Sequence, residues 1–314
     1  MRIRIPVKKG AALFLLIFVL FFSCTKSGDK GSNSKGDNLP EQKNTDNSSE
    51  KNTSTDLPDL ADTIARLSRD TVGVVSDREA FVDGFWRWIF GEAGIPERLA
   101  RKVAASALES PSFIMELLVV LQQDPFTYYL VDKQHALPDG YEPGDLVSLK
   151  AGAYRLGREG LTLRKIAAEA LGELATAAAA DGIVFTVGSA YRSAAYQAQV
   201  YEREVNTYGQ EVADRESARP GKSQHQLGLT LDFAPIDDSF AKTPASQWLL
   251  KNASRNGWSL SFPDGYEEVT GYRWESWHYR YVGKDLAAFI DSYFEGIQQY
   301  ALQFIHAWQE QAGE

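Results

Sequence analysis

The stretch Ser223-Gln-His-Gln-Leu-Gly228, which continues as Leu229-Thr-Leu-Asp-Phe233, joins a turn to a short strand. Gly228 suits the turn because glycine tolerates positive backbone φ angles. The residues after it alternate in character, which is typical of a strand. The turn is expected to bring His225, which precedes it, close to Asp232 on the strand. One imidazole and one carboxylate would then meet at one point.

A second motif, Glu275-Ser-Trp-His278, supplies another imidazole and another carboxylate. The chain has only four histidines, and two of them lie in these two motifs. His225, Asp232 and His278 form the set of nitrogen and oxygen ligands that catalytic zinc uses, with a fourth position left for water. Taken singly, each residue also fits a surface histidine or a strand-end carboxylate. Their combination favours a metal site.

Glu275 lies three residues before His278, where a carboxylate can take a proton from a metal-activated water. On a continuous strand these two side chains would point to opposite faces. Both can therefore address one metal only if the backbone bulges or turns near Ser276. The alternative is that Glu275 is a surface carboxylate paired with Arg273 or Arg280.

Upstream, Ser189-Ala-Tyr-Arg-Ser193 and Gln197 complete three patterns: Ser-x-Tyr-Arg-Ser-x-x-x-Gln, Ser-x-His-x-x-Gly-x-x-x-Asp and Glu-x-x-His. Together these patterns resemble the VanY-type D-alanyl-D-alanine carboxypeptidases. The segments Leu130–Pro138 and Tyr141–Asp145 also resemble the opening of that catalytic domain. The similarity covers roughly residues 124 to 295.

The resemblance implies a zinc peptidase that releases the C-terminal D-alanine from peptidoglycan stem peptides, with D,D-carboxypeptidase activity favoured. It implies Glu275 as the general base, and it puts Arg192 where relatives have an arginine that faces the substrate. A guanidinium group there can grip a carboxylate or stabilise an oxyanion; the alternative is a structural salt bridge at a helix start. Gln197 and Ser223 are candidates for binding the peptide.

Two rival functions stay open at this point. One is an L,D-carboxypeptidase acting on tetrapeptide stems, because both activities occur behind similar motifs. The other is a non-catalytic, wall-binding lipoprotein that keeps the fold, although the intact motifs argue against it. The remaining histidines, His135 and His306, are predicted not to bind metal. A formal net charge of −9, with no basic run beyond the first nine residues, argues against a nucleic-acid partner.

The N-terminus has the features of an export signal. Four basic residues among the first nine precede an apolar segment, residues 11–22, that is shorter than a membrane span of about 20 residues. Cys24, the only cysteine, follows and resembles a bacterial lipobox. We expect residues 1–23 to be a lipoprotein signal peptide and Cys24 to carry lipid on the exported protein, in the periplasm or on the outer surface of the cytoplasmic membrane. Ordinary secretion or an uncleaved anchor is the alternative.

Three further segments are expected after the signal. Residues 24–56 contain few apolar side chains and are predicted to form a disordered tether. Residues 57–122 are predicted to be a helical accessory region, in which the aromatic run Phe81–Phe90 forms a core or, alternatively, a surface for peptidoglycan. Residues 123–314 are predicted to be the catalytic domain.

The catalytic domain is predicted to be α+β, with a mainly antiparallel sheet flanked by helices. A helix is expected from Leu161 to Asp181, and another is expected to begin after a Ser193 cap. Strands are expected at Ile183–Val187, Leu229–Phe233, Trp258–Phe262 and Tyr272–Val282.

Overall fold

A computed structural model of the chain describes residues 75–311. The predicted signal peptide, Cys24, the tether and the first part of the helical accessory region lie outside these residues. Among the residues described, no single helix is long and apolar enough to cross a membrane. One pair of helices that meet at a sharp bend, Glu97–Glu109 and Ser112–Leu121, passes that test by length and composition together.

Within residues 75–311, the larger of two sheets has five strands, in the spatial order β2 (Arg155–Leu156), β4 (Thr186–Ser189), β5 (Thr230–Phe233), β7 (His278–Tyr281) and β6 (Trp258–Leu260). Only β2 and β4 are parallel, and the other neighbours pair antiparallel. The smaller sheet pairs β1 (Leu146–Ser148) with β3 (Thr162–Arg164). This architecture confirms the predicted α+β fold with a mainly antiparallel sheet.

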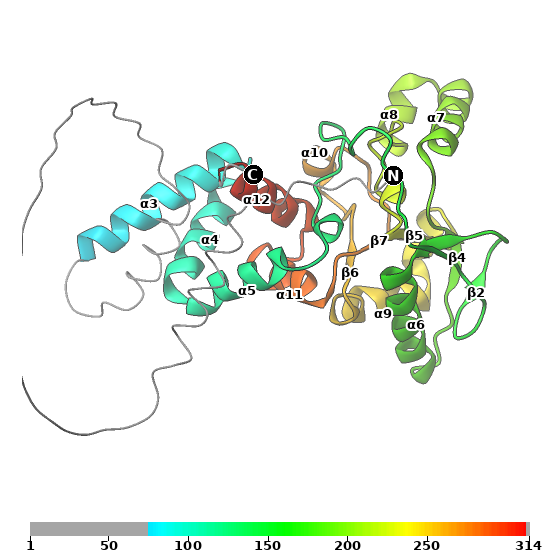
Figure 1. The fold of residues 1–314 in the computed structure, drawn as a ribbon, viewed down its shortest axis with the longest axis horizontal. Helices are drawn as coiled ribbons and strands as arrows, with labels where there is room; N and C mark the ends of the chain where they lie inside the picture. The colour runs from blue at the N-terminus through cyan, green and yellow to red at the C-terminus, as the bar shows by residue number, and fades with distance from the viewer. Residues whose placement is uncertain (1–74, 312–314) are drawn as a thin grey trace, which may run out of the picture. The chain divides into compact units, whose positions relative to one another are not determined.

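Apolar side chains on the flanking helices pack with the sheet to form the hydrophobic core. In α6 (Lys165–Ala180), buried apolar residues recur every three or four positions and share one hydrophobic cluster with Val187 of β4 and Phe233 of β5. Figure 1 draws α6 beside these strands. The cluster also takes in Leu249 of α9 (Pro244–Asn252).

Several predicted boundaries are wrong; the strand expected at Ile183–Val187, for example, is β4 at Thr186–Ser189. The helix expected from Leu161 begins only at Lys165, because Thr162–Arg164 pairs with β1 as a strand. The strand expected from Tyr272 to Val282 is reduced to His278–Tyr281, because only these residues pair with neighbouring strands. The residues just before β7, including Glu275, therefore do not have strand geometry.

Five helices lie together in Figure 1: α3 (Val75–Glu92), α4 (Glu97–Glu109), α5 (Pro111–Leu121), α11 (Lys284–Tyr293) and α12 (Gln298–Gln311). We call these five helices the helical layer. Aromatic rings connect α3, α5, α11 and α12, whereas α4 contributes buried aliphatic side chains such as Leu99 and Val103. Phe304 of α12 is fully buried and contacts the rings of Phe85, Phe113 and Trp308. The aromatic run at 81–90 therefore contributes mainly to a core, as predicted, although Phe90 is exposed.

This packing joins the two ends of the described chain. The rings of the predicted accessory region find their partners on α12, which the sequence pattern assigns to the catalytic domain. The domain boundaries themselves stay a prediction.

Candidate metal centre and pocket

The turn at Gly228 positions the first motif. His225 lies in a short 3₁₀ helix, η2 (Gln224–Leu227), which ends at Gly228 with a φ angle of 70°. A Cβ atom at this position would come within 2.9 Å of Cγ of Arg164. Both the backbone angle and the lack of space therefore require glycine. The chain then enters β5, which carries Asp232.

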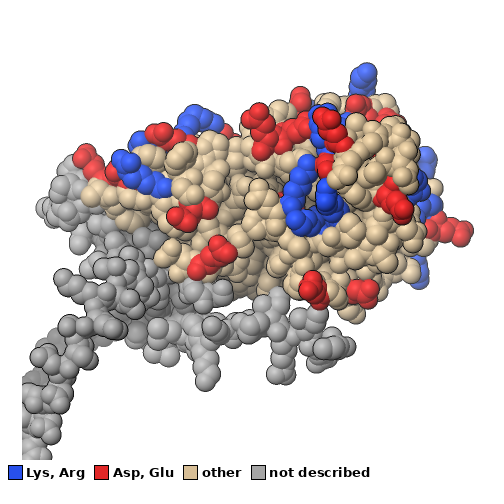
Figure 2. All heavy atoms as spheres, turned by 90° about the horizontal axis from the view of Figure 1, so that it is seen from above, with Lys and Arg blue, Asp and Glu red and all other residues tan. Residues whose placement is uncertain are grey.

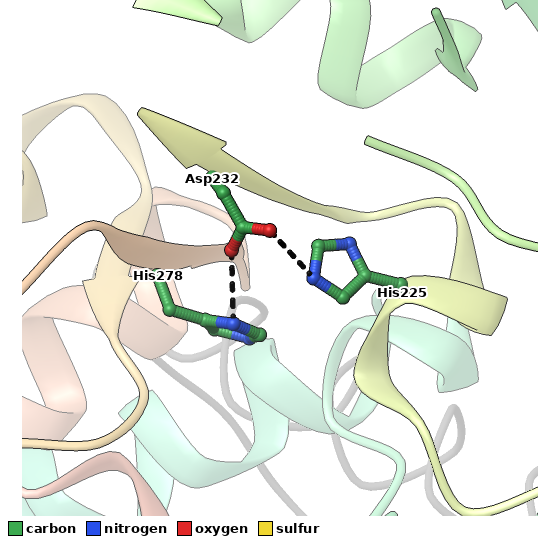
Figure 3. Close-up of side chains that lie close together, drawn as sticks. All are labelled: His225, Asp232 and His278. Carbon is green, nitrogen blue, oxygen red and sulfur yellow. Dashed lines mark ion pairs between the residues drawn. The ribbon is translucent and has the colours of Figure 1, made fainter. Parts of the chain in front are cut away.

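Strand pairing brings the second motif to the same place. Asp232 on β5 is the register partner of His278 on β7. Figure 3 shows the Asp232 carboxylate between the two imidazoles, with Oδ2 3.2 Å from Nε2 of His225 and Oδ1 3.1 Å from Nδ1 of His278. One ligand atom from each residue lies within 4.8 Å of the other two, and all three residues are buried. The three predicted ligands therefore converge.

Hydrogen bonds to the outer ring nitrogens fix which atom of each histidine faces the centre. Nδ1 of His225 lies 2.7 Å from the carbonyl oxygen of Ala190, which can only accept, so Nδ1 carries the proton and Nε2 faces Asp232. Nε2 of His278 lies 3.4 Å from Oε1 of Gln224, which leaves Nδ1 to face the centre. Opposite ring nitrogens of the two histidines thus point inward.

The protonation of the group suits a bound cation. Burial and the charge of Arg192 lower the pKa of His225 to about 4, so this imidazole stays neutral. Burial lowers the pKa of His278, but the carboxylates of Asp232 and Glu275, 3.1 and 3.2 Å from its Nδ1, outweigh it and raise the pKa to about 9. Burial raises the pKa of Asp232, but the two imidazoles hold it well below its ordinary value. A metal ion at this point would take the place of the His278 proton.

A buried oxygen atom without a hydrogen-bond partner tests whether these residues fit a metal ion. Oδ1 of Asp232 is buried and has no hydrogen-bond partner among the described residues, although Nδ1 of His278 lies 3.1 Å away. Close approach without hydrogen-bond geometry is expected when two atoms are ligands of the same cation. The donor set, two imidazoles and a carboxylate, also matches catalytic zinc. The residues fit this metal.

Glu275 reaches the three candidate ligands because the backbone turns near Ser276, as the sequence predicts. Residues 276 and 277 form a turn between Glu275 and β7, and the N–H of His278 approaches the carbonyl oxygen of Glu275 at 3.3 Å. Oε2 of Glu275 consequently lies 3.2 Å from Nδ1 of His278. The carboxylate stands at the edge of the ligand group, with its side chain 12% exposed.

The alternative partners of Glu275 are engaged elsewhere. Arg273 forms ion pairs with Asp238 at 2.7 Å and Glu216 at 3.2 Å. Arg280 is fully buried and donates to three backbone carbonyl groups of residues 126, 127 and 129. Glu275 is therefore not a surface carboxylate held by either arginine.

Arg192 touches the candidate metal ligands themselves. Its Nη2 donates to Oδ2 of Asp232 at 2.8 Å, and Nε and Nη2 both approach Oγ of Ser189. The contact depends on the register that pairs Ser189 with Asp232 across β4 and β5. The sequence predicts either a structural salt bridge or an arginine that faces the substrate. Arg192 forms a salt bridge with Asp232 and also lines the pocket in front of the candidate ligands.

That pocket has a volume of about 250 Å³ and contains all the predicted site residues of the catalytic domain. Ser223 is buried at its wall, and its hydroxyl group has no hydrogen-bond partner among the described residues. Gln197 is also buried there; its amide nitrogen donates to the carbonyl oxygen of Ala218, while its Oε1 has no partner in the described part of the chain.

The structure adds residues that the sequence patterns did not single out. Gln224 contacts His278 and accepts a hydrogen bond from Ser261 at 2.7 Å. The ring of Phe262 packs on His278 with a centroid distance of 4.6 Å. Gln224 lies next to His225 in the sequence, but its position in the sequence does not indicate that its side chain contacts His278.

With this geometry in hand, comparisons with known proteins identify the class. The family model for D-alanyl-D-alanine carboxypeptidase (VanY) matches residues 160–284, a range that includes all three candidate ligands and Glu275. A putative carboxypeptidase of Bacillus subtilis (strain 168), YodJ, is 34% identical over 184 residues, which cover 54% of this chain and 67% of that protein. The chain therefore belongs to the VanY family of D-alanyl-D-alanine carboxypeptidases, and its relatives indicate a hydrolase.

Two further similarities agree with this placement. A D-alanyl-D-alanine carboxypeptidase of Enterococcus faecalis (strain ATCC 700802 / V583) is 32% identical over 184 residues, covering 56% of this chain and 65% of that protein. The solved structure of the LD-carboxypeptidase LdcB matches with a TM-score of 0.50 and 34% identity, over 56% of this chain and 89% of that chain. The chain thus spans about two thirds of the length of these two relatives from B. subtilis and E. faecalis.

Proposed function

We propose that this protein is a zinc-dependent carboxypeptidase that removes the C-terminal D-alanine from peptidoglycan stem peptides, with D,D-carboxypeptidase activity favoured. The observation that carries the proposal is the convergence of His225, Asp232 and His278 within 4.8 Å at a pocket that also holds Glu275. Membership of the VanY family supports the substrate class. Zinc would be held by Nε2 of His225, the carboxylate of Asp232 and Nδ1 of His278.

Bound zinc supplies a Lewis acid that polarises the scissile carbonyl group and makes water more acidic. The rest of the chemistry belongs to the chain. Glu275 accepts the proton of the attacking water and passes it to the leaving amine. Arg192 uses Nη2 and Nε to hold Asp232 and Ser189, and its Nη1, which has no hydrogen bond to a described residue, faces the substrate oxygen or carboxylate.

Ser223 and Gln197 are proposed peptide contacts. The hydroxyl group of Ser223 can donate to a substrate oxygen, and the unpartnered Oε1 of Gln197 can accept from a peptide N–H. Burying these groups against a substrate would complete hydrogen bonds that the free protein lacks.

The second candidate is an L,D-carboxypeptidase, and the similarity to LdcB favours it. The full chain, purified in detergent, should be given defined tri-, tetra- and pentapeptide stems and the products weighed by mass spectrometry. Loss of D-alanine from the pentapeptide alone supports the D,D activity, and loss from the tetrapeptide supports the L,D activity. Zinc binding without any cleavage would favour the non-catalytic, wall-binding lipoprotein.

Metal content provides the matching test. Elemental analysis should find about one zinc per chain, and a chelator should abolish activity until zinc is restored. His225→Ala, Asp232→Ala and His278→Ala should each lose tight zinc binding, because two remaining ligands make a poor site. Unchanged zinc content in all three variants would refute the assignment.

We further propose that the protein is exported and anchored to the cell envelope by lipid on Cys24. The cationic start, the short apolar segment and this lone cysteine support the proposal. A Cys24→Ser variant should lose lipid labelling and leave the membrane fraction while keeping its carboxypeptidase activity. Retention of this variant in the membrane would show instead that residues 11–22 remain as an anchor.

A further inference from the structure

Most charged side chains that line the pocket already have opposite charges beside them. Arg192 binds Asp232, Arg273 binds Glu216, and Glu275 lies against His278. Figure 2, which shows one face of the molecule, likewise has acidic and basic side chains interspersed. Glu204 differs from the other carboxylates of the pocket, because it has no ion pair or hydrogen bond with any residue between 75 and 311.

Glu204 stands on a regular wall. Helix α7 (Ala194–Tyr208) presents Gln197, Val200 and Glu204 to the pocket, at the three- and four-residue spacing that places side chains on one helix face. Glu204 lies seven positions after Gln197 on the helix, a rise of about 10 Å. The wall therefore runs from an amide group, over an apolar side chain, to an unpaired carboxylate.

The neighbouring helix holds this wall in place. α8 (Gln210–Glu216) packs against α7, and Arg215 makes a two-pronged ion pair with Glu267 of α10 (Glu267–Thr270), at 2.6 and 2.8 Å. At its near end, Gln197 is tied to the carbonyl oxygen of Ala218. A carboxylate carried by a helix that is held in place is suited to select a charged group on a ligand, because the backbone needs little ordering on binding.

The dimensions match a peptide. An extended chain advances about 3.3 Å per residue, so the distance from Gln197 to Glu204 spans about three residues. A substrate with its C-terminal bond at the ligand group would run its preceding residues along this wall. Val200 can then cover the aliphatic part of a long side chain, and Glu204 can meet a cationic end.

We propose that Glu204 binds the side-chain ammonium group of a diamino acid in the stem peptide, and so selects substrates whose third residue is basic. This inference rests on the proposed function, because it takes the substrate to be a stem peptide cleaved at its C-terminal end. It assigns substrate selection to α7 rather than to the metal centre.

The test compares two pentapeptide stems that differ in one charge: lysine or Nε-acetyl-lysine at the third position. The full-length wild type should cleave the lysine peptide with the higher kcat/KM. Glu204→Gln should lower kcat/KM for the lysine peptide by about three- to tenfold, as expected for a partly exposed charge pair, and leave the acetylated peptide unchanged. Glu202→Gln is the matched control, because Glu202 is exposed on the same helix and does not line the pocket.

Binding separates this inference from the proposed function. In a Glu275→Gln background, calorimetry should show tighter binding of the lysine peptide, and a second change, Glu204→Gln, should remove that preference. This result would support the role of Glu204 even if wild type showed no turnover, which would refute only the proposed activity. Equal binding of both peptides, or equal losses on both in Glu204→Gln, would overturn the inference.

Discussion

Replacing Glu275 by glutamine separates proton transfer from metal binding. Glutamine keeps the size of the side chain but cannot accept a proton at neutral pH. General bases contribute about 10²- to 10⁴-fold to rates, which corresponds to about 2.7 to 5.5 kcal/mol of transition-state stabilisation. Because Glu275 is buried to 9% exposure beside the ligand group, bulk water cannot readily replace it as a base. We expect turnover to fall by a factor of about 10² or more.

The metal should be unaffected by this change. Glu275 is not one of the three residues whose ligand atoms lie within 4.8 Å of one another, and its contact with His278 is a single approach at 3.2 Å. Zinc content, measured by elemental analysis, should therefore match wild type. The assay is the initial rate of D-alanine release from a stem pentapeptide at saturating zinc. Glu268→Gln, at an exposed position on the nearby α10, is the control for the substitution itself.

Two outcomes would contradict this reasoning in different ways. Turnover within about threefold of wild type would mean that another group is the base, since such a change falls far short of general-base contributions. Loss of zinc together with activity would mean that Glu275 is a ligand, and that the turn at residues 276 and 277 brings it closer to the metal than its contact with His278 indicates.

Three further predictions concern the surroundings of the site. Gln224→Leu should weaken zinc affinity by about 10- to 100-fold, because His278 loses the partner of its outer nitrogen; unchanged affinity in a competition assay would refute that role. Phe304→Ala should lower the free energy of unfolding by about 3 to 5 kcal/mol, and a denaturant titration showing less than about 1 kcal/mol would mean that the helical layer repacks around the cavity. Burial raises the pKa of Asp132, but hydrogen bonds from the backbone N–H groups of His135 and Gln134, together with the His135 imidazole, outweigh burial and lower the pKa. The ionised Asp132 therefore stabilises the folded protein above its ordinary pKa, and this stabilisation is lost as the pH falls below about 4. Asp132→Asn should flatten the decline of stability in this acidic range, and an unaltered pH profile of unfolding would contradict the assignment.

The candidate ligands could be predicted from the sequence because their chemistry is rare in this chain. Two of four histidines lie in motifs with fixed spacing to a carboxylate, and the structure brings His225, Asp232 and His278 together. The turn before His278 could also be predicted, because Glu275 could not otherwise reach the same point. Local constraints of this kind act within a few residues, where sequence patterns are most informative.

The contact between Arg192 and Asp232, which depends on strand register, could not be predicted. Arg192 reaches Asp232 because β4 and β5 pair Ser189 with Asp232, and a shift by one residue would reverse the faces of these side chains. Nothing in the local sequence around Arg192 specifies that register. The same holds for Gln224, whose partner His278 lies 54 positions away.

Side chains that no local pattern connects also link the helical layer to the candidate metal centre. Phe304 anchors α12 in the aromatic core, and Gln298, at the first turn of the same helix, lies 3.5 Å from the hydroxyl group of Ser261. Ser261 donates to Gln224, which in turn supports His278. Since the outer contacts of metal ligands fix ligand orientation, the packing of the helices determines part of the geometry of the site. The N-terminal helices thus contribute to the site indirectly, because Phe304 and Trp308 of α12 pack against rings of α3 and α5.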